Sequence, residues 1–291
     1  MRDSLKGPVN MENFLLDDDW IDPYEIDITV AHPARRYNYW LGGTDNFEAD
    51  RISGDAVAKA FPTIKVAAIE NRGFLRRAVT FLVEEAGVRQ FLDIGTGIPA
   101  AGNVHEVAQS IAPDSRVVYV DNDPIVLAHA RRLLGSAQDG ATAYIHADLR
   151  DSDAILQHPD LQKTLDLSKP VALMLIWVLH LLDDSEDPHA HIPALTSALA
   201  PGSHLVISHA TGDFMSTEVS DAVQSAARQQ SIRGRDPFQL RDRAEIARFF
   251  AGMELVPPGV ASVSEWRADR PPGERPANAV SASYGAVARI R

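Results

Sequence analysis

Two closely spaced glycines follow a short apolar run in the segment Phe91-Leu92-Asp93-Ile94-Gly95-Thr96-Gly97-Ile98-Pro99-Ala100. Glycine lets a backbone turn sharply and approach a ligand closely, which a Cβ atom would prevent. Gly95, Thr96 and Gly97 are therefore candidates for a turn that binds a ligand. The pattern also fits a weak dinucleotide fingerprint. A third interpretation is a purely structural turn that Asp93 caps.

Asp93 distinguishes between the two kinds of ligand. A dinucleotide would place its pyrophosphate at the start of the following helix, where a nearby carboxylate repels it. The ammonium group of S-adenosylmethionine would be attracted to the same carboxylate. The loop therefore favours S-adenosylmethionine as the cofactor. Arg72 is a candidate partner for the carboxylate of this donor, the alternative being a plain surface arginine.

Two further acids follow the next two apolar runs. Asp121 lies 24 positions beyond Gly97, where an adenosine ribose would offer its two hydroxyl groups to a carboxylate. Asn122, which comes next, is counted in the same site. Asp148 can accept a hydrogen bond from the adenine amino group, and the backbone of Leu149 is placed to meet the ring. The three acids together predict a site for the whole donor.

Asp123 has a different explanation. It comes directly before Pro124, and Asp followed by Pro is typical of a helix N-cap with proline at the first helical position. We therefore expect Asp123 to cap a helix rather than to contact the donor.

Two histidines are candidates for a catalytic base. His180 follows the predicted fourth strand and His209 ends the fifth, and either could accept a proton from the methyl acceptor. A structural role is the alternative for each. A metal site formed with Asp213 matches no compact ligand motif, so none is predicted. The segment Trp177-Val178-Leu179-His180 stands where an Asn/Asp-Pro-Pro-Tyr signature would mark methylation of base or glutamine amino groups, which disfavours those substrates.

Alternating apolar runs and helical stretches position these residues. We predict an α/β fold with a doubly wound, Rossmann-like, seven-stranded and mostly parallel sheet, whose ligand lies at the carboxyl ends of the strands. The parallel strands are predicted at residues 89–94, 116–121, 142–147, 171–178 and 203–209. A helix at 240–251, an extended run at 253–260 and a last strand at 282–290 predict an antiparallel C-terminal hairpin that closes the sheet.

The segment at residues 31–62 is predicted to form an N-terminal helical lid ahead of a domain at 63–291. It carries Tyr37, Tyr39 and Trp40 beside a Gly-Gly pair, and a helical pattern at 48–61. Aromatic surface next to a glycine hinge is typical of a lid, and a packed core is the alternative. The next amphipathic helix, at 63–87, is expected to leave Arg72, Arg76 and Arg77 away from its apolar face.

The composition is that of an ordinary globular enzyme, with 291 residues of which 45% are hydrophobic and 23% charged. The net charge of −12 disfavours a nucleic-acid partner. The chain has no cysteine, which excludes disulfides, thiolate nucleophiles and iron–sulfur clusters. Residues 1–30 carry a net charge of −6 and are expected to be a mobile acidic tail. Without a signal-peptide pattern or a membrane-length apolar run, the protein is expected in the cytoplasm.

The motifs together resemble the class I S-adenosylmethionine-dependent methyltransferases over about residues 63–291. More narrowly, the chain is similar to a bacterial S-adenosyl methyltransferase family of unassigned substrate. The segments that carry this likeness are Ala34 to Phe47, Asn71 to Ala78, Asp93 to Pro99, Asn103-x-His105-Glu106 and Val120 to Pro124. The resemblance implies that Asp93, Gly95 and Gly97 line the methionine end of the donor, Asp121 its ribose, and Asp148 with Leu149 its adenine. Pro99 departs from the class, which has a third glycine there.

The expected function is methyl transfer from S-adenosylmethionine to an oxygen or nitrogen of an unknown small molecule. A nucleotide-dependent oxidoreductase and a non-catalytic S-adenosylmethionine-binding module are the alternatives. The expected partner is the small-molecule acceptor, with no membrane and no nucleic acid. The oligomeric state is left open.

Overall fold

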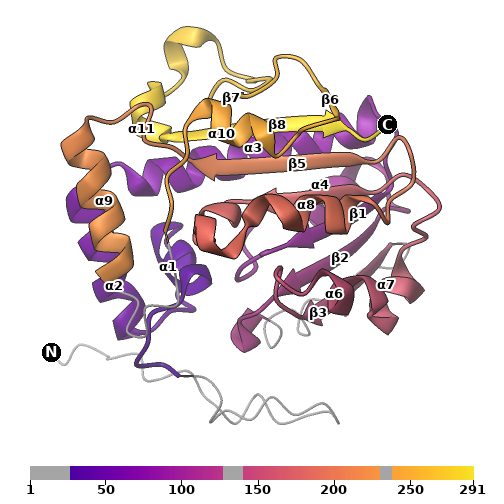
Figure 1. Cartoon of the computed structure of the whole chain (residues 1–291), viewed down its shortest axis with the longest axis horizontal. Helices are drawn as coiled ribbons and strands as arrows, with labels where there is room; N and C mark the ends of the chain where they lie inside the picture. The colour runs from indigo at the N-terminus through magenta and orange to yellow at the C-terminus, as the bar shows by residue number, and fades with distance from the viewer. Residues whose placement is uncertain (1–26, 127–139, 230–237) are drawn as a thin grey trace, which may run out of the picture.

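A computed structural model describes residues 27–126, 140–229 and 238–291 (Figure 1). Of the predicted acidic tail at residues 1–30, positions 1–26 lie outside the described residues. Eight strands form one sheet in the order β3-β2-β1-β4-β5-β8-β6, and β7 also pairs with β8. Their bounds are β1 Gln90–Ile94, β2 Arg116–Asp121, β3 Ala141–His146, β4 Ala172–Ile176, β5 His204–Ala210, β6 Glu254–Leu255, β7 Ala261–Ser262 and β8 Ser283–Arg289.

The parallel part of the sheet confirms the predicted fold class. The strands β1 to β5 pair in parallel, and Asp93 of β1 lies opposite Tyr119 of β2 and Met174 of β4. The last strand, β8, runs antiparallel to β5. The sheet has eight strands rather than the predicted seven, because β6 occupies only the start of the extended run at 253–260 and the additional short strand β7 follows just beyond that run. Pro257 and Pro258 lack the N–H groups that would continue the ladder.

The helices cover both faces of the sheet and one of its ends. Their bounds are α1 Pro33–Trp40, α2 Glu48–Ala60, α3 Ile64–Glu84, α4 Val104–Ile111, α6 Ser152–Gln157, α7 Pro159–Thr164, α8 Pro188–Thr196, α9 Thr217–Gln229, α10 Arg243–Arg248 and α11 Asn278–Ser281, with short 3₁₀ turns η4 Leu179–Leu181, η5 Asp184–Glu186 and η6 Pro272–Glu274. None of these described helices is long and apolar enough to cross a membrane.

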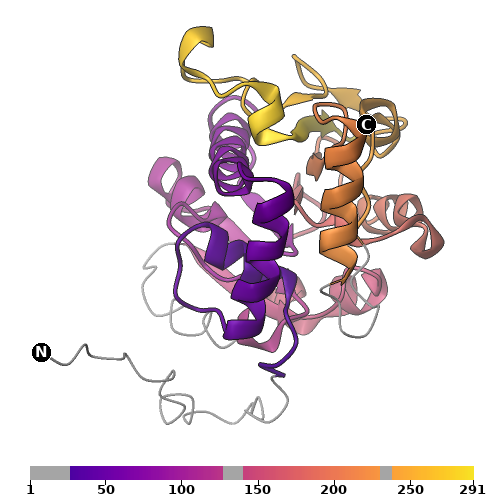
Figure 2. The same cartoon turned by 90° about the vertical axis from the view of Figure 1, so that its left-hand side faces the viewer.

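Successive residues of each strand pack against opposite layers, as the two-residue period of a strand requires. Phe91 and Val117 join the core with α3 and α4, whereas Leu92 and Val118 join the core with α6, α7, α8 and α10. The arrow of β5 points toward α9, and α1, α2 and α9 gather at this carboxyl end of the parallel strands (Figure 1). Figure 2 looks onto this end and shows α2 and α9 side by side.

Helix α3 confirms the predicted apolar face and corrects one detail of it. Phe74, Ala78 and Leu82 are fully buried at four-residue spacing. Arg77, however, does not lie away from the core, because its guanidinium is buried and donates hydrogen bonds to the carbonyl oxygens of Val263 and Trp266. The partners lie almost two hundred positions further along the chain, so the helical pattern alone could not reveal them.

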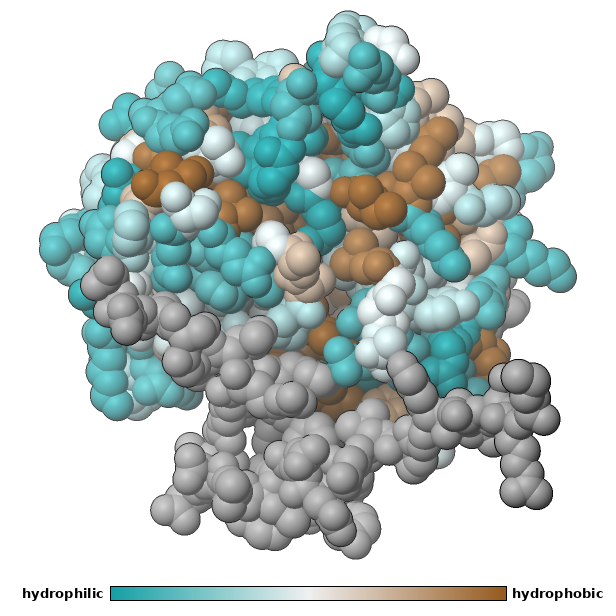
Figure 3. Space-filling view, turned by 180° about the vertical axis from the view of Figure 1, so that it is seen from behind, coloured by the Kyte–Doolittle hydropathy of each residue, from teal (hydrophilic) through white to brown (hydrophobic). Residues whose placement is uncertain are grey.

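The molecular surface is mostly polar. The face seen from behind is largely hydrophilic with separate apolar patches (Figure 3). The exposed large apolar side chains of the described residues are Ile28, Ile52, Val66, Ile69, Ile111 and Leu255. Scattered exposure of this kind is normal for a globular protein.

Candidate functional site

One cavity lies at the carboxyl ends of the parallel strands, under α1. All nine residues predicted to bind the donor line it, namely Arg72, Asp93, Gly95, Thr96, Gly97, Asp121, Asn122, Asp148 and Leu149. They come from α3 and from the ends of β1, β2 and β3. Parallel strands end at one edge of the sheet, which brings these distant segments of the chain together.

The glycine loop after β1 has the geometry that its sequence predicts. Gly95 and Gly97 adopt positive φ angles of 73° and 68°, a region that favours glycine. A Cβ atom on Gly95 would lie 2.5 Å from Cγ2 of Val178, whereas one on Gly97 would meet only Cβ of Ala34 at 3.9 Å. Gly95 is therefore needed for packing, and Gly97 leaves the cavity open for close approach of a ligand.

Asp93 is a buried carboxyl group at the inner end of the cavity. Burial raises its pKa to about 7, although the charge of Arg72 and a hydrogen bond from Thr96 act in the opposite direction. A carboxyl group in this state is half protonated near neutral pH and gains from an incoming cation. The site therefore fits the ammonium group of S-adenosylmethionine.

We expect donor binding to release a proton from Asp93. An ammonium group favours the carboxylate, so the pKa of Asp93 falls when the donor binds, and binding below about pH 7 must displace the proton. The dissociation constant should rise toward about tenfold per pH unit below this pKa and level off above it. Calorimetry at three pH values, in buffers of different ionisation enthalpy, measures both effects.

The control for this experiment is Asp93→Asn, which cannot titrate at this position. It should bind the donor more weakly than the parent and without the proton release. A parent affinity that stays constant between about pH 6 and 8, with no proton exchange, would contradict the role of Asp93.

Asp121 ends β2 and holds the glycine loop. Its Oδ2 accepts a hydrogen bond from Gly97 N at 2.7 Å, and its Oδ1 accepts one from Asp123 N at 2.9 Å. Burial raises the pKa of Asp121, opposed by the charge of His32 and by these backbone hydrogen bonds. Each carboxylate oxygen has a second lone pair, so both can still accept from ribose hydroxyls.

Asp148 lies beyond β3 and is an ionised carboxylate. Burial acts to raise its pKa, but hydrogen bonds and charge from Arg150, with a hydrogen bond from Asn122, outweigh burial and lower the pKa to about 2. Asn122 Nδ2 donates to Asp148 Oδ2 at 3.1 Å. A donor adenine would therefore share this carboxylate with Arg150, and Leu149 lines the same part of the cavity.

Arg72 lines the cavity and is anchored by the loop between β1 and α4. Its Nη2 donates to the carbonyl oxygen of Ala101 at 3.1 Å and to Oδ1 of Asn103 at 3.1 Å. It is not a plain surface arginine, since it lines the cavity and its charge reaches Asp93. A carboxylate ligand would meet a cation whose position is already fixed.

The two candidate bases differ in their surroundings. His180 is buried, lines the cavity and has an Nδ1 atom with no hydrogen bond among the described residues. His209 does not line the cavity, and both of its ring nitrogens have partners: Nδ1 lies 2.7 Å from the carbonyl oxygen of Ala210, and Nε2 lies 3.1 Å from Nη1 of Arg241. Only His180 is brought to the site.

Burial holds both histidines neutral. Desolvation is the largest cause for each, with the pKa of His180 well below its usual value and that of His209 lowered to about 3. The two imidazole rings lie 5.6 Å apart.

Asp213, the third residue considered for a metal site, accepts a hydrogen bond from Arg243 N and lies outside the cavity. Across 27–126, 140–229 and 238–291, no group of three or more His, Asp or Glu side chains could hold a metal ion.

The three aromatic residues of the predicted lid take different positions. Tyr37 and Trp40 line the cavity, and Trp40 Nε1 donates to the carbonyl oxygen of Gly54 at 3.2 Å. Tyr39 is not part of the lining, and its hydroxyl donates to Asp55 at 2.8 Å. The segment thus covers the cavity and packs against α2 as well, which combines the two interpretations of the sequence.

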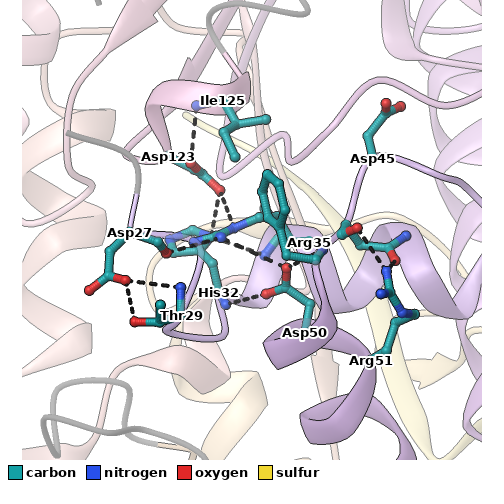
Figure 4. Close-up of polar contacts among 12 residues, drawn as sticks. Asp27, Thr29, His32, Arg35, Asp45, Asp50, Arg51, Asp123 and Ile125 are labelled. Atoms are coloured by element: carbon teal, nitrogen blue, oxygen red, sulfur yellow. Dashed lines mark hydrogen bonds and ion pairs between the residues drawn. The ribbon is translucent and has the colours of Figure 1, made fainter. Parts of the chain in front are cut away.

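A buried ionic cluster that the sequence did not indicate fixes α1 over the site (Figure 4). Oδ2 of Asp123 lies 3.1 Å from Nδ1 of His32 and 3.2 Å from Nε of Arg35. His32 N also donates to Asp50 at 2.8 Å. The predicted N-cap is present, since Oδ1 of Asp123 accepts from Ile125 N at 3.0 Å. The only sequence signal for the contacts of Asp123 with these two residues was the basic character of His32 and Arg35 beside the aromatic segment. The neighbouring sequence does not indicate that Asp123 is their partner.

Comparison with known proteins places the chain in a family. A family model described as S-adenosyl methyltransferase matches residues 20–291. A DUF574 family protein from Streptomyces avermitilis is 44% identical, with 91% of this chain and 99% of that chain covered and a TM-score of 0.85. A candidate methyltransferase from Thermobifida fusca is 39% identical, with 94% and 100% covered and a TM-score of 0.84.

No functionally curated protein matches the chain. The family match covers both the donor loop and the C-terminal strands of the sheet. The family is described by its use of S-adenosylmethionine, which is therefore the cofactor. The chain belongs to the S-adenosyl methyltransferase family, as a methyltransferase that depends on S-adenosylmethionine.

Proposed function

We propose that the protein transfers the methyl group to an oxygen or nitrogen atom of a small molecule. The observation that supports this is a single cavity in which the donor residues and the neutral ring of His180 are both present. S-adenosylmethionine supplies a methyl group on a sulfonium, whose leaving group needs no acid. The protein therefore has to align the acceptor, exclude water and remove a proton.

His180 is the residue proposed to take that proton. Nδ1 is buried and has no hydrogen-bond partner in the part of the chain that the structure describes, and Nε2 is the nitrogen proposed to meet the acceptor. The low pKa keeps the ring unprotonated at neutral pH, with a nitrogen lone pair free to accept a proton. It also makes the ring a weak base, so the proton is expected to transfer as the methyl group bonds to the acceptor atom, which makes that proton strongly acidic. His209 is proposed as a neighbour that packs against His180 and fixes its position.

Arg241 holds the turn that carries His180. It is buried, its Nη1 donates to the carbonyl oxygen of Leu179 at 3.1 Å, and its Nη2 donates to that of Leu182 at 3.1 Å. Gln239 N donates to the carbonyl oxygen of His180 at 2.8 Å. The backbone around the proposed base is thus fixed on both sides.

Water exclusion is proposed for the N-terminal segment. Tyr37 and Trp40 wall the cavity from α1, and the cluster around Asp123 fixes α1 to the end of β2. A nucleic-acid acceptor is not expected, because the chain has a net charge of −12.

Calorimetric titration with S-adenosylmethionine, S-adenosylhomocysteine and NAD tests the donor half of this proposal. We expect both sulfur ligands to bind at micromolar concentration and NAD not to bind, since Asp93 repels a pyrophosphate. Formation of S-adenosylhomocysteine across a panel of small hydroxyl and amino compounds then tests transfer. Binding of NAD alone would overturn the proposal, and donor binding without product over the panel would favour a binding module.

A further inference from the structure

The part of the cavity beyond the donor residues is walled by apolar side chains. They come from α2, from the start of α3, from α9 and from the described stretch just before α10, and include Val57, Phe61, Ile64, Val223, Ala227 and Phe238. We call this part the apolar chamber. Most of its walls belong to a separate small core that α2 and α9 share. An acceptor there exchanges water for apolar contacts over most of its surface.

Aromatic rings follow one another along the chamber. The Tyr37 and Trp177 rings are 5.4 Å apart at 63°, the Trp177 and His180 rings 5.8 Å apart at 89°, and the His180 and Phe238 rings 5.1 Å apart at 64°. Aromatic rings attract one another in edge-to-face and offset arrangements. A flat ring bound beside them can extend the series.

The polar groups of these walls already have partners inside the protein. Trp177 Nε1 donates to Ser283 Oγ at 2.9 Å, and the Tyr37 hydroxyl donates to the carbonyl oxygen of Ala68 at 3.2 Å. Asn71 donates to Tyr37 at 3.0 Å and accepts from Ser208 at 2.6 Å. Among the described lining residues of the chamber, His180 alone has a ring without a hydrogen bond. A polyhydroxylated acceptor would leave most of its own polar groups unpaired, which is costly.

Arginine charge surrounds the proposed base. Arg36 lines the cavity and donates from Nη1 to Ser53 Oγ at 3.0 Å, and Arg241 lies on the far side of His209. Both charges act on His180. Positive charge favours an oxygen that becomes negative as it loses a proton and disfavours an ammonium ligand. The chamber therefore favours a hydroxyl over an amine.

We propose that the acceptor is a flat, mainly apolar aromatic molecule whose phenolic hydroxyl meets His180. The inference rests on the proposed function and narrows its substrate class. The phenolic oxygen gains the methyl carbon as the sulfur–methyl bond breaks with its electron pair left on sulfur. The phenolic proton passes to Nε2 of His180, and from there to solvent after the product leaves.

Binding of matched probes to the protein saturated with S-adenosylhomocysteine tests this. The reference probe is 2-naphthol, compared with decahydro-2-naphthol, naphthalenemethylamine and 6-hydroxynaphthalene-2-sulfonate. We expect 2-naphthol to bind roughly three- to tenfold more tightly than its saturated analogue. It should bind at least about tenfold more tightly than either charged compound. Phenol and 9-phenanthrol cover smaller and larger rings.

Two substitutions in α9 provide the matched control. Ala227 faces the chamber and Ala222 faces solvent. Ala227→Leu should weaken the binding of 2-naphthol at least about fivefold because the added carbon atoms occupy the chamber. Ala222→Leu should leave the binding of 2-naphthol unchanged. Val57→Ala enlarges the opposite wall and should improve the binding of 9-phenanthrol relative to phenol, which keeps the test open if Ala227→Leu folds poorly.

Two failures are distinguishable in this design. Loss of S-adenosylhomocysteine binding in the parent protein would overturn the proposed function itself. Normal binding of S-adenosylhomocysteine, with tighter binding of the charged probes than of all three phenols, would overturn only the aromatic acceptor. The aromatic acceptor would also be overturned if none of the three phenols binds, or if Ala227→Leu and Ala222→Leu bind 2-naphthol equally well.

Discussion

Replacing His180 with glutamine is expected to lower kcat for a phenolic acceptor by about 10²- to 10⁴-fold, the usual contribution of a positioned general base. The donor affinity should be unchanged, because His180 does not contact the donor residues at the ends of β1 and β2. The rate of S-adenosylhomocysteine formation with 2-naphthol, alongside calorimetric titration of the donor, measures the two effects separately.

The pH profile gives an independent readout of the same residue. Burial keeps the pKa of His180 well below its usual value of 6.5. The parent kcat should therefore show no loss from His180 protonation between about pH 8 and 6, a range in which an exposed histidine base would begin to titrate. If His180 is a base, the loss of kcat in His180→Gln should be smaller for more acidic phenols. If His180 has only a structural role, the loss should not depend on the acidity of the phenol.

His158→Gln is the matched control. His158 lies between α6 and α7, has a side chain that is 35% exposed, and is not part of the cavity lining. It should retain the parent kcat. An unchanged kcat in His180→Gln, with a normal melting temperature, would contradict proton transfer to His180.

The residues that sequence reasoning placed correctly are those whose position follows from the local pattern. Gly95 and Gly97 follow directly on a buried strand, and Asp121 and Asp148 each stand at or just after the end of one. A residue at the end of a parallel strand lies at the carboxyl edge of the sheet, so its position depends little on the rest of the chain. The donor half of the cavity was therefore predictable.

The residues that sequence reasoning could not place depend on distant partners. Asp123 looked like a helix cap, and it is one, but His32 and Arg35 reach it from about 90 positions away. His180 follows β4 and His209 lies near the end of the neighbouring strand β5, so their positions in the sequence looked equivalent. The side chain of Arg241, from much later in the chain, engages His209 and leaves His180 facing the cavity. Pairings of this kind arise from tertiary packing and have no periodic signal.

The two halves of the cavity also differ in how the chain builds them. The donor half comes from strand ends and a tight glycine loop, with the charged groups Asp93, Asp121 and Arg72. The apolar chamber comes from helices α2 and α9, which are tied to the sheet mainly by apolar contacts. Helical walls can change their side chains without disturbing the donor loop. Acceptor preference can therefore vary among relatives while the donor site is kept.

We expect donor binding to depend most strongly on Asp121. Replacement by asparagine keeps the shape of the side chain but removes its charge, so ribose hydroxyls lose two charge-assisted hydrogen bonds of about 1.5–3 kcal/mol each. We expect the dissociation constants of S-adenosylmethionine and S-adenosylhomocysteine to rise on the order of 10²- to 10³-fold, less than the full sum because the amide oxygen still accepts one bond. Calorimetry with both ligands measures this.

Two comparisons separate loss of the ligand contact from loss of the fold. Asp114→Asn removes an exposed carboxylate that has only a long contact of 3.7 Å to Arg89, and it should bind the donor like the parent. Asp121→Asn keeps one oxygen for either Gly97 N–H or Asp123 N–H and sets its NH2 group against the other, so it should lower the melting temperature to some extent. Asp121→Ala removes the acceptor for both N–H groups and should lower the melting temperature more. If Asp121→Asn binds the donor as tightly as the parent, the ribose lies elsewhere and Asp121 serves only to hold the glycine loop. If both variants lose binding while Asp121→Asn melts close to the parent, the carboxylate contacts the donor directly.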